Sequence, residues 1–148
     1  MSEPQFSREA IYAALFGLAS GAAGFATATR RIKEYSGVDQ ATQPALLQVE
    51  LGEKWESRIG LPPVVKLNVR LFVYCESNDP TEAVSTQMNA LLDAVTNALA
   101  PPVLPHGTFR QTLGGLVSHA GIAGEIVIAE GLSGQSEAVI PIEILVNA

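Results

Sequence analysis

The chain has 148 residues, of which 47% are hydrophobic and 16% charged, and this composition predicts one folded domain over residues 1–148 and argues against disorder. The formal net charge of −6 disfavours specific nucleic-acid binding as the main role, because phosphates would be repelled. The low share of charged side chains indicates that other subunits cover part of the surface. One cysteine excludes an intramolecular disulfide framework and is typical of a reducing compartment.

Residues 10–29 form a run of twenty without a charged side chain, which is about the length that spans a bilayer. Eight of the twenty are Ala and three are Gly, so the run favours a buried helix of a soluble domain. Glu3, Arg8 and Glu9 leave no net positive charge before the run, unlike a signal peptide. We therefore expect no membrane association and no targeting segment.

The first helix is predicted from the capping residue Ser7 to about Ala22, with apolar side chains at helical spacing. A weak strand over residues 25–32, a polar loop over 33–43 and a strand over 44–51 follow. Residues 52–63 are predicted to be a charged connection that carries the only tryptophan, Trp55.

The third strand has the clearest pattern, because apolar residues alternate with polar or aromatic ones. Its buried face is predicted to consist of Val65, Leu67, Val69, Leu71, Val73 and Cys75. Cys75 continues this face as a small hydrophobic residue. A catalytic thiol would need a nearby His and an electropositive pocket, and neither lies close in the sequence.

A second helix is predicted over residues 80–100, with Asp79 as its cap, Pro80 in the first position and Glu82 completing a capping box. The apolar residues at helical spacing are Val84, Met88, Leu91, Leu92, Val95 and Leu99. Pro101 and Pro102 end this helix.

The last third of the chain has the pattern of strands. After a strand near residues 108–112, one strand places Ile122, Gly124, Ile126 and Ile128 on one face, and a second places Ala138, Ile140, Ile142, Ile144 and Val146 on one face. Pro141 lacks an amide donor, so the last strand is predicted to be an edge or to carry a bulge. The fold class is therefore α+β, with two helices packed on one face of a mixed, largely antiparallel sheet of about six strands, in the order α-β-β-β-α-β-β-β.

Residues suited to catalysis are few. His106 and His119 have no second His, Cys or carboxylate at metal-ligand spacing. Ser118 and His119 are neighbours in a predicted strand and would point to opposite faces. His119 is expected to be a partly exposed or hydrogen-bonded structural residue. We predict no enzymatic activity, no catalytic residues, no cofactor and no metal.

Several stretches resemble the tail terminator (tail completion) proteins of long-tailed bacteriophages. They include Arg8-Glu-Ala-Ile-Tyr-Ala-Ala-Leu-Phe, Gln111-Thr-Leu-Gly-Gly-Leu-Val-Ser-His119 and Ala138-Val-Ile-Pro-Ile-Glu-Ile-Leu-Val146. The resemblance covers nearly the whole chain, but its motifs are packing motifs. It implies a homohexameric ring on the last ring of the tail tube, which stops tube growth and offers a surface for the head–tail connector protein. It also implies assembly in the host cytoplasm and a final place at the tail–head junction of a siphovirus-like virion.

An acidic ring would let DNA pass without binding it, and ring closure would cover exposed strand edges. The resemblance maps no functional side chains, so the interface is predicted from chemistry alone. The predicted interface residues are the one Trp and the charged residues around it: Glu53, Lys54, Trp55, Glu56 and Arg58. Trp and Arg often dominate binding energy. An ordinary surface loop with its Trp packed back on the domain is the alternative. Two other functions also stay open: another head–tail joining or tail-tube-related protein, and a small ligand-binding domain or enzyme.

Overall fold

The computed structural model describes residues 6–31, 37, 38, 40–77, 79–102 and 109–147. In chain order the elements are α1 (Arg8–Ala19), β1 (Thr27–Thr29), a short 3-10 helix η2 (Gln40–Thr42), β2 (Ala45–Arg58), β3 (Leu61–Glu76), α2 (Val84–Leu99), β4 (His119–Ile122), β5 (Val127–Glu130) and β6 (Gln135–Asn147). The predicted α+β class, with two helices and about six strands, is confirmed. The bounds of several elements differ from the prediction.

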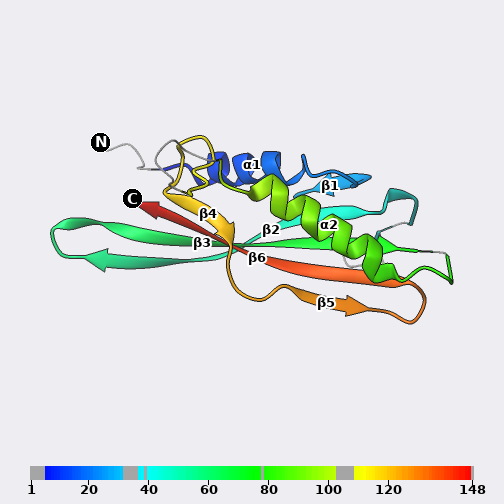
Figure 1. The fold of residues 1–148 in the computed structure, drawn as a ribbon. Coiled ribbons are helices and arrows are strands. Elements are labelled where there is room, and N and C mark those ends of the chain that lie inside the picture. The colour runs from blue at the N-terminus through cyan, green and yellow to red at the C-terminus, as the bar shows by residue number, and fades with distance from the viewer. Residues whose placement is uncertain (1–5, 32–36, 39, 78, 103–108, 148) are drawn as a thin grey trace.

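The six strands form one curled sheet in the order β1-β2-β3-β6-β4 (Figure 1). β5 also pairs with β6, on the side that β4 occupies. The β1–β2 pair is parallel and the other pairs are antiparallel. The sheet is therefore mixed and largely antiparallel, with β3 and β6 at its centre.

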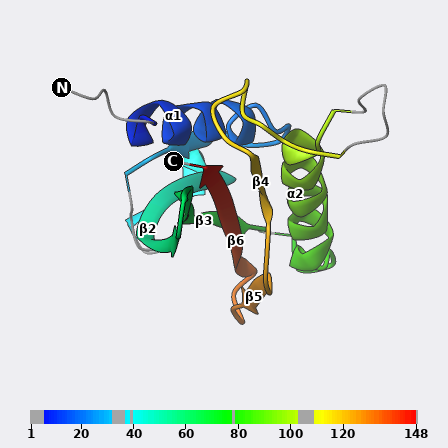
Figure 2. The same cartoon turned by 90° about the vertical axis from the view of Figure 1, so that its left-hand side faces the viewer.

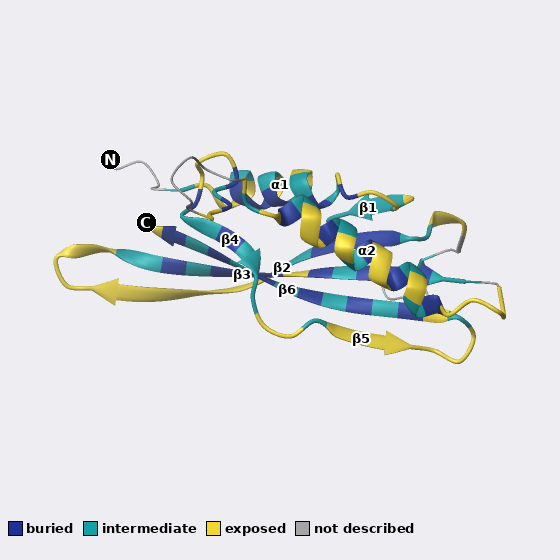
Figure 3. Ribbon diagram, in the orientation of Figure 1, coloured by how far each residue is buried: buried dark blue, intermediate teal, exposed yellow. Residues whose placement is uncertain are grey.

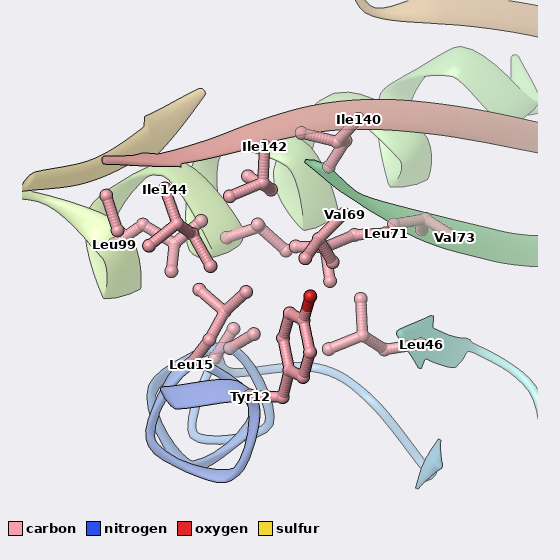
Figure 4. Close-up of a cluster of buried hydrophobic side chains, with 14 of the residues drawn as sticks. Tyr12, Leu15, Leu46, Val69, Leu71, Val73, Leu99, Ile140, Ile142 and Ile144 are labelled. Carbon is pink, nitrogen blue, oxygen red and sulfur yellow. The ribbon is translucent and has the colours of Figure 1, made fainter. Parts of the chain in front are cut away.

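Both helices lie over the same side of the sheet (Figure 2), and their apolar stripes meet the faces of β3 and β6 that alternation predicts. Figure 4 shows Tyr12 and Leu15 of α1 opposite Leu71 and Ile142. All six predicted inward residues of β3, from Val65 to Cys75, are buried in this core. Strand periodicity alone thus located the central layer of the protein.

The helix boundaries are set by local hydrogen bonds. Ser7 caps α1 as predicted, since its Oγ accepts from the amide of Ala10 at 3.2 Å. The predicted cap of α2 is wrong. Asp79 Oδ1 instead accepts from the backbone N and the hydroxyl of Thr81, at 2.9 and 2.7 Å, which closes a local turn. α2 therefore begins four residues later than expected, at Val84.

Pro141 explains why the expected single strand around Ile126 is two strands. Gly124 lies at φ +110°, and a Cβ there would be 3.4 Å from the Pro141 ring. Ala123 donates its amide to the Pro141 carbonyl at 3.1 Å, and between Ile122 and Val127 no ladder pair with β6 forms. Because Pro141 has no N–H for this side of β6, the partner strand breaks there.

β6 is an interior strand, so the edge alternative predicted from Pro141 is wrong. As to the bulge alternative, the ladder with β3 runs through Pro141 without a register shift, and the irregularity lies on the other side, between β4 and β5. The strand expected near residues 108–112 is also wrong, because residues 109–112 are not in a strand. Residue 108 lies outside the described residues. The weak strand predicted over residues 25–32 shortens to Thr27–Thr29. Among the described residues, no helix is long and apolar enough to cross a membrane.

Candidate subunit interface

Residues 52–63, predicted to be a connecting loop, belong to a long β-hairpin that projects from the body of the protein (Figure 1). We call residues 51–63 the arm. Ile59 and Gly60 form its two-residue turn, where Gly60 has φ +74°. Pro62 and Pro63 indicated a loop, yet β6 ends opposite Val64. Pro62 and Pro63 lie at the register shift between Glu56 and Arg58, where neither pairs with β2, and no described residue of β6 pairs with them. An irregular position of this kind tolerates a missing amide.

The arm is exposed along its length (Figure 3). Trp55 is 50% exposed, and Ile59 and Leu61 near the tip are 104% and 60% exposed. β1 pairs with β2 only from Ala45 to Leu47, and no other described strand covers the outer edge of β2. Uncovered strand edges with apolar side chains are typical of surfaces that bind another chain.

An ion pair holds the root of the arm against α1. Arg8 donates two hydrogen bonds to the Glu53 carboxylate, from Nε at 2.8 Å and from Nη2 at 3.0 Å. Trp55 Nε1 donates to the same carboxylate at 3.1 Å. The Arg8 hydrogen bond lowers the pKa of Glu53 below its usual range. Glu53 thus connects the arm to α1, and its charge is neutralised within the subunit.

Trp55 packs partly against its own subunit. Its ring centroid lies 6.1 Å from that of Phe6, with the planes tilted by 38°, and the Arg8 guanidinium lies 5.1 Å from the Phe6 centroid. Because half of the Trp55 surface stays exposed, the stack orients the indole and leaves part of it open to a partner.

The other predicted interface residues also lie on the arm. Lys54 is directly opposite Lys66, and Glu56 is opposite Val64. Arg58 donates to the Pro62 carbonyl from Nε at 2.9 Å and from Nη2 at 2.5 Å, which ties the two strands together near the tip. All five residues are therefore brought together on one projecting element.

The sequence did not predict a second set of ion pairs near the arm or the apolar side chains at the tip of the arm. Arg30 contacts Glu9 at 2.5 Å and Glu50 at 2.6 Å, and so connects α1, the residue after β1 and the middle of β2. These partners are about twenty residues apart in the chain, where no helical or strand spacing relates them. Ile59 and Leu61 flank Gly60, and that turn glycine is the signal that could have revealed the hairpin.

Cys75 lies in the core, and His119 is half-buried and hydrogen-bonded, as predicted. Cys75 is fully buried, and burial raises the pKa of its thiol to about 11. His119 Nδ1 accepts from the backbone N of Gln111 at 3.2 Å. Within the described part of the chain, no group of three or more His, Cys, Asp or Glu residues could hold a metal ion.

No protein-family model matches the chain, and no curated protein matches it. Among solved structures, the chain is similar to a chain in the virion of a native gene transfer agent particle, with a TM-score of 0.57 and 11% sequence identity. The match covers 95% of this chain and 96% of the other. At this identity the similarity establishes a shared fold over the whole domain.

Proposed function

We propose that this protein is a structural component of a phage-like virion, and specifically a tail terminator. In this role a ring of identical subunits, a homohexamer in the terminators that the sequence resembles, caps the end of the tail tube. The ring stops tube polymerisation and offers a surface for the head–tail connector protein. The observation that carries the proposal is the fold match to a chain of a gene transfer agent virion, which spans nearly all of both chains.

The surface of the molecule supports assembly. The arm exposes one edge of the sheet and the β5 side exposes the other, and edges of this kind are covered when subunits close into a ring. The net charge of −6 suits a channel through which DNA passes without binding. The chemistry-bearing residues Cys75 and His119 serve packing and hydrogen bonding, which favours an assembly role over catalysis.

A second function is also compatible with the fold match: another head–tail joining or tail-tube-related virion protein. The two functions differ in where the protein binds. A terminator caps the tube at its end, whereas a tube-related protein adds along the tube or polymerises by itself.

Electron microscopy of the purified protein, alone and mixed with tail tubes, tests the proposal. We expect rings of one size and density only at tube ends. Polymers or binding along the tube would support the second function, and absence of both rings and tube binding would overturn the virion role.

The interface residues are tested with the double variant Trp55→Ala/Arg58→Ala. Truncating a Trp and an Arg at an interface weakens ring formation or tube binding by about 2–4 kcal/mol, while the monomer stays folded. Asp93→Ala/Asn97→Ala, on the exposed side of α2, is the matched control. Unchanged oligomer mass and tube binding in the arm variant would mean that the arm is only a surface hairpin.

A further inference from the structure

The charges of this protein are divided between the two halves of the sheet. Residues 1–70 contain eight Lys or Arg and seven Asp or Glu, whereas residues 71–148 contain one Arg and eight Asp or Glu. β1, β2 and most of β3 belong to the first set, and β4, β5 and β6 to the second. Because β2 and β5 lie at different ends of the sheet (Figure 2), the two ends carry different charge.

The arm presents unneutralised basic charge. Lys54 lies directly opposite Lys66, and like charges in this position destabilise a sheet unless an anion approaches. Lys66 contacts Glu143 at 3.4 Å, but no described carboxylate pairs with Lys54 or Arg58. Arg8 neutralises Glu53, which leaves Glu56 as the one acidic group of the arm without a described ion pair.

The β5 edge has the complementary character. All four residues of β5 are exposed, with Val127 at 54% and Ile128 at 47%. Glu125 and Glu130 flank these side chains and are exposed too. Residues 111–148 contain four Glu and no Lys or Arg. One edge of β5 pairs with β6, and no described strand pairs with the other.

We propose that the arm edge of one copy pairs with the β5 edge of a second copy, so that the sheet continues from subunit to subunit. This contact rests on the proposed ring function and names the surfaces that build it. Main-chain hydrogen bonds between edges supply affinity, and alternating side chains supply specificity. The surfaces differ from each other, so the contact is head-to-tail, and such contacts form a ring when the rotation between neighbouring copies closes.

The two edges match through one apolar pair on the same face and through the opposite charge of the two edges. Trp55 pairs with Val65, and Ile128 pairs with Ala138. The side chains of Val65 and Ala138 lie in the core beneath the helices. Trp55 and Ile128 therefore share the helix-bearing face of a continuous sheet and meet as an apolar pair. Lys54 lies on the opposite face from Trp55 and Glu130 on the same face as Ile128, so the basic arm and the acidic β5 edge attract as whole edges and not as one facing pair. The partner at each edge is a second copy of the chain, because each chain carries both surfaces. One kind of contact then covers both exposed edges.

A charge-swap series tests the contact. Lys54→Glu/Arg58→Glu and Glu125→Lys/Glu130→Lys should each weaken self-association roughly tenfold to a hundredfold, and the quadruple variant should restore it, because the two edges again carry opposite charge. Glu82→Lys/Asp93→Lys changes net charge as much as the β5 variant does, at exposed sites away from both edges, and should assemble like the parent. Light scattering after gel filtration gives the mass over a concentration series, free and with tail tubes, and circular dichroism confirms folding.

A quadruple variant that stays folded but unassembled would overturn the contact, as would a β5 variant that assembles like the parent. If the parent forms rings that cap tubes and the swaps have no effect, the contact fails while the proposed function stands. A parent that stays monomeric both free and with tail tubes overturns both.

Discussion

Arg8 and Glu53 are 45 residues apart in the chain and form a two-point ion pair, Nε to Oε1 at 2.8 Å and Nη2 to Oε2 at 3.0 Å. The pair joins the first turn of α1 to the root of the arm. Since Trp55 donates to the same carboxylate, one acidic side chain positions both the arm and its indole. The ion pair therefore ties the root of the arm to the N-terminal helix.

Glu53→Gln should lower the melting temperature by about 1–3 °C at pH 7, because a half-exposed ion pair stabilises a domain of this size only modestly. The pKa of Glu53 is lowered in the folded state. Its stabilisation is therefore full above the unfolded pKa of about 4.3 and is lost as the pH falls through the lower folded pKa. Thermal melts of parent and variant from neutral pH down to pH ~3 measure this difference.

Glu56→Gln, on the same strand and exposed, is the control and should leave the melting temperature unchanged at both ends of this range. A destabilisation by Glu53→Gln that persists undiminished in acid would show that the carboxylate charge is not what holds the arm.

Gly134→Ala should destabilise the protein more than Gly60→Ala. Both glycines have positive φ, +80° and +74°, but a Cβ at position 134 would lie 2.3 Å from the Ser77 carbonyl oxygen, whereas one at position 60 would meet nothing within 4 Å. Gly60→Ala should cost about 1–2 kcal/mol for the backbone conformation alone. Chemical denaturation of the two variants compares them, and equal losses would contradict the close approach of the β5–β6 turn to Ser77.

Cys75 should react with a thiol reagent only when the protein unfolds. Its side chain is fully buried and burial raises its pKa to about 11, so neither access nor thiolate is available at pH 8. Labelling should therefore be slow in buffer and fast in denaturant. Cys75→Ala should keep ring formation and tube capping, provided that the variant is folded. Rapid labelling of the native protein would place the thiol outside the core.

Local periodicity explains what could be predicted from the sequence. The alternation from Val65 to Cys75 and from Ala138 to Val146 identifies the two central strands, because over these two stretches one face of each strand is buried. The helical spacing from Val84 to Leu99 likewise identifies the face of α2 that lies on the sheet. The α+β class follows from these patterns.

The features that depend on contacts between distant residues could not be predicted from the sequence. The arm is a hairpin because the second half of β2 pairs with the start of β3, and Pro62 and Pro63 are accommodated at the register shift between Glu56 and Arg58. The strand around Gly124 breaks because it meets Pro141, which lies in another strand.

The candidate interface shows the same division. The sequence determined the kinds of residues in it, a Trp and an Arg among alternating charges. The fold decided that Glu53 is neutralised by Arg8, that Lys54 is left opposite Lys66, and that an acidic, apolar edge lies at the other end of the sheet. The physical reason is that the pattern along a strand selects the buried face, whereas strand order and register select which side chains meet across strands.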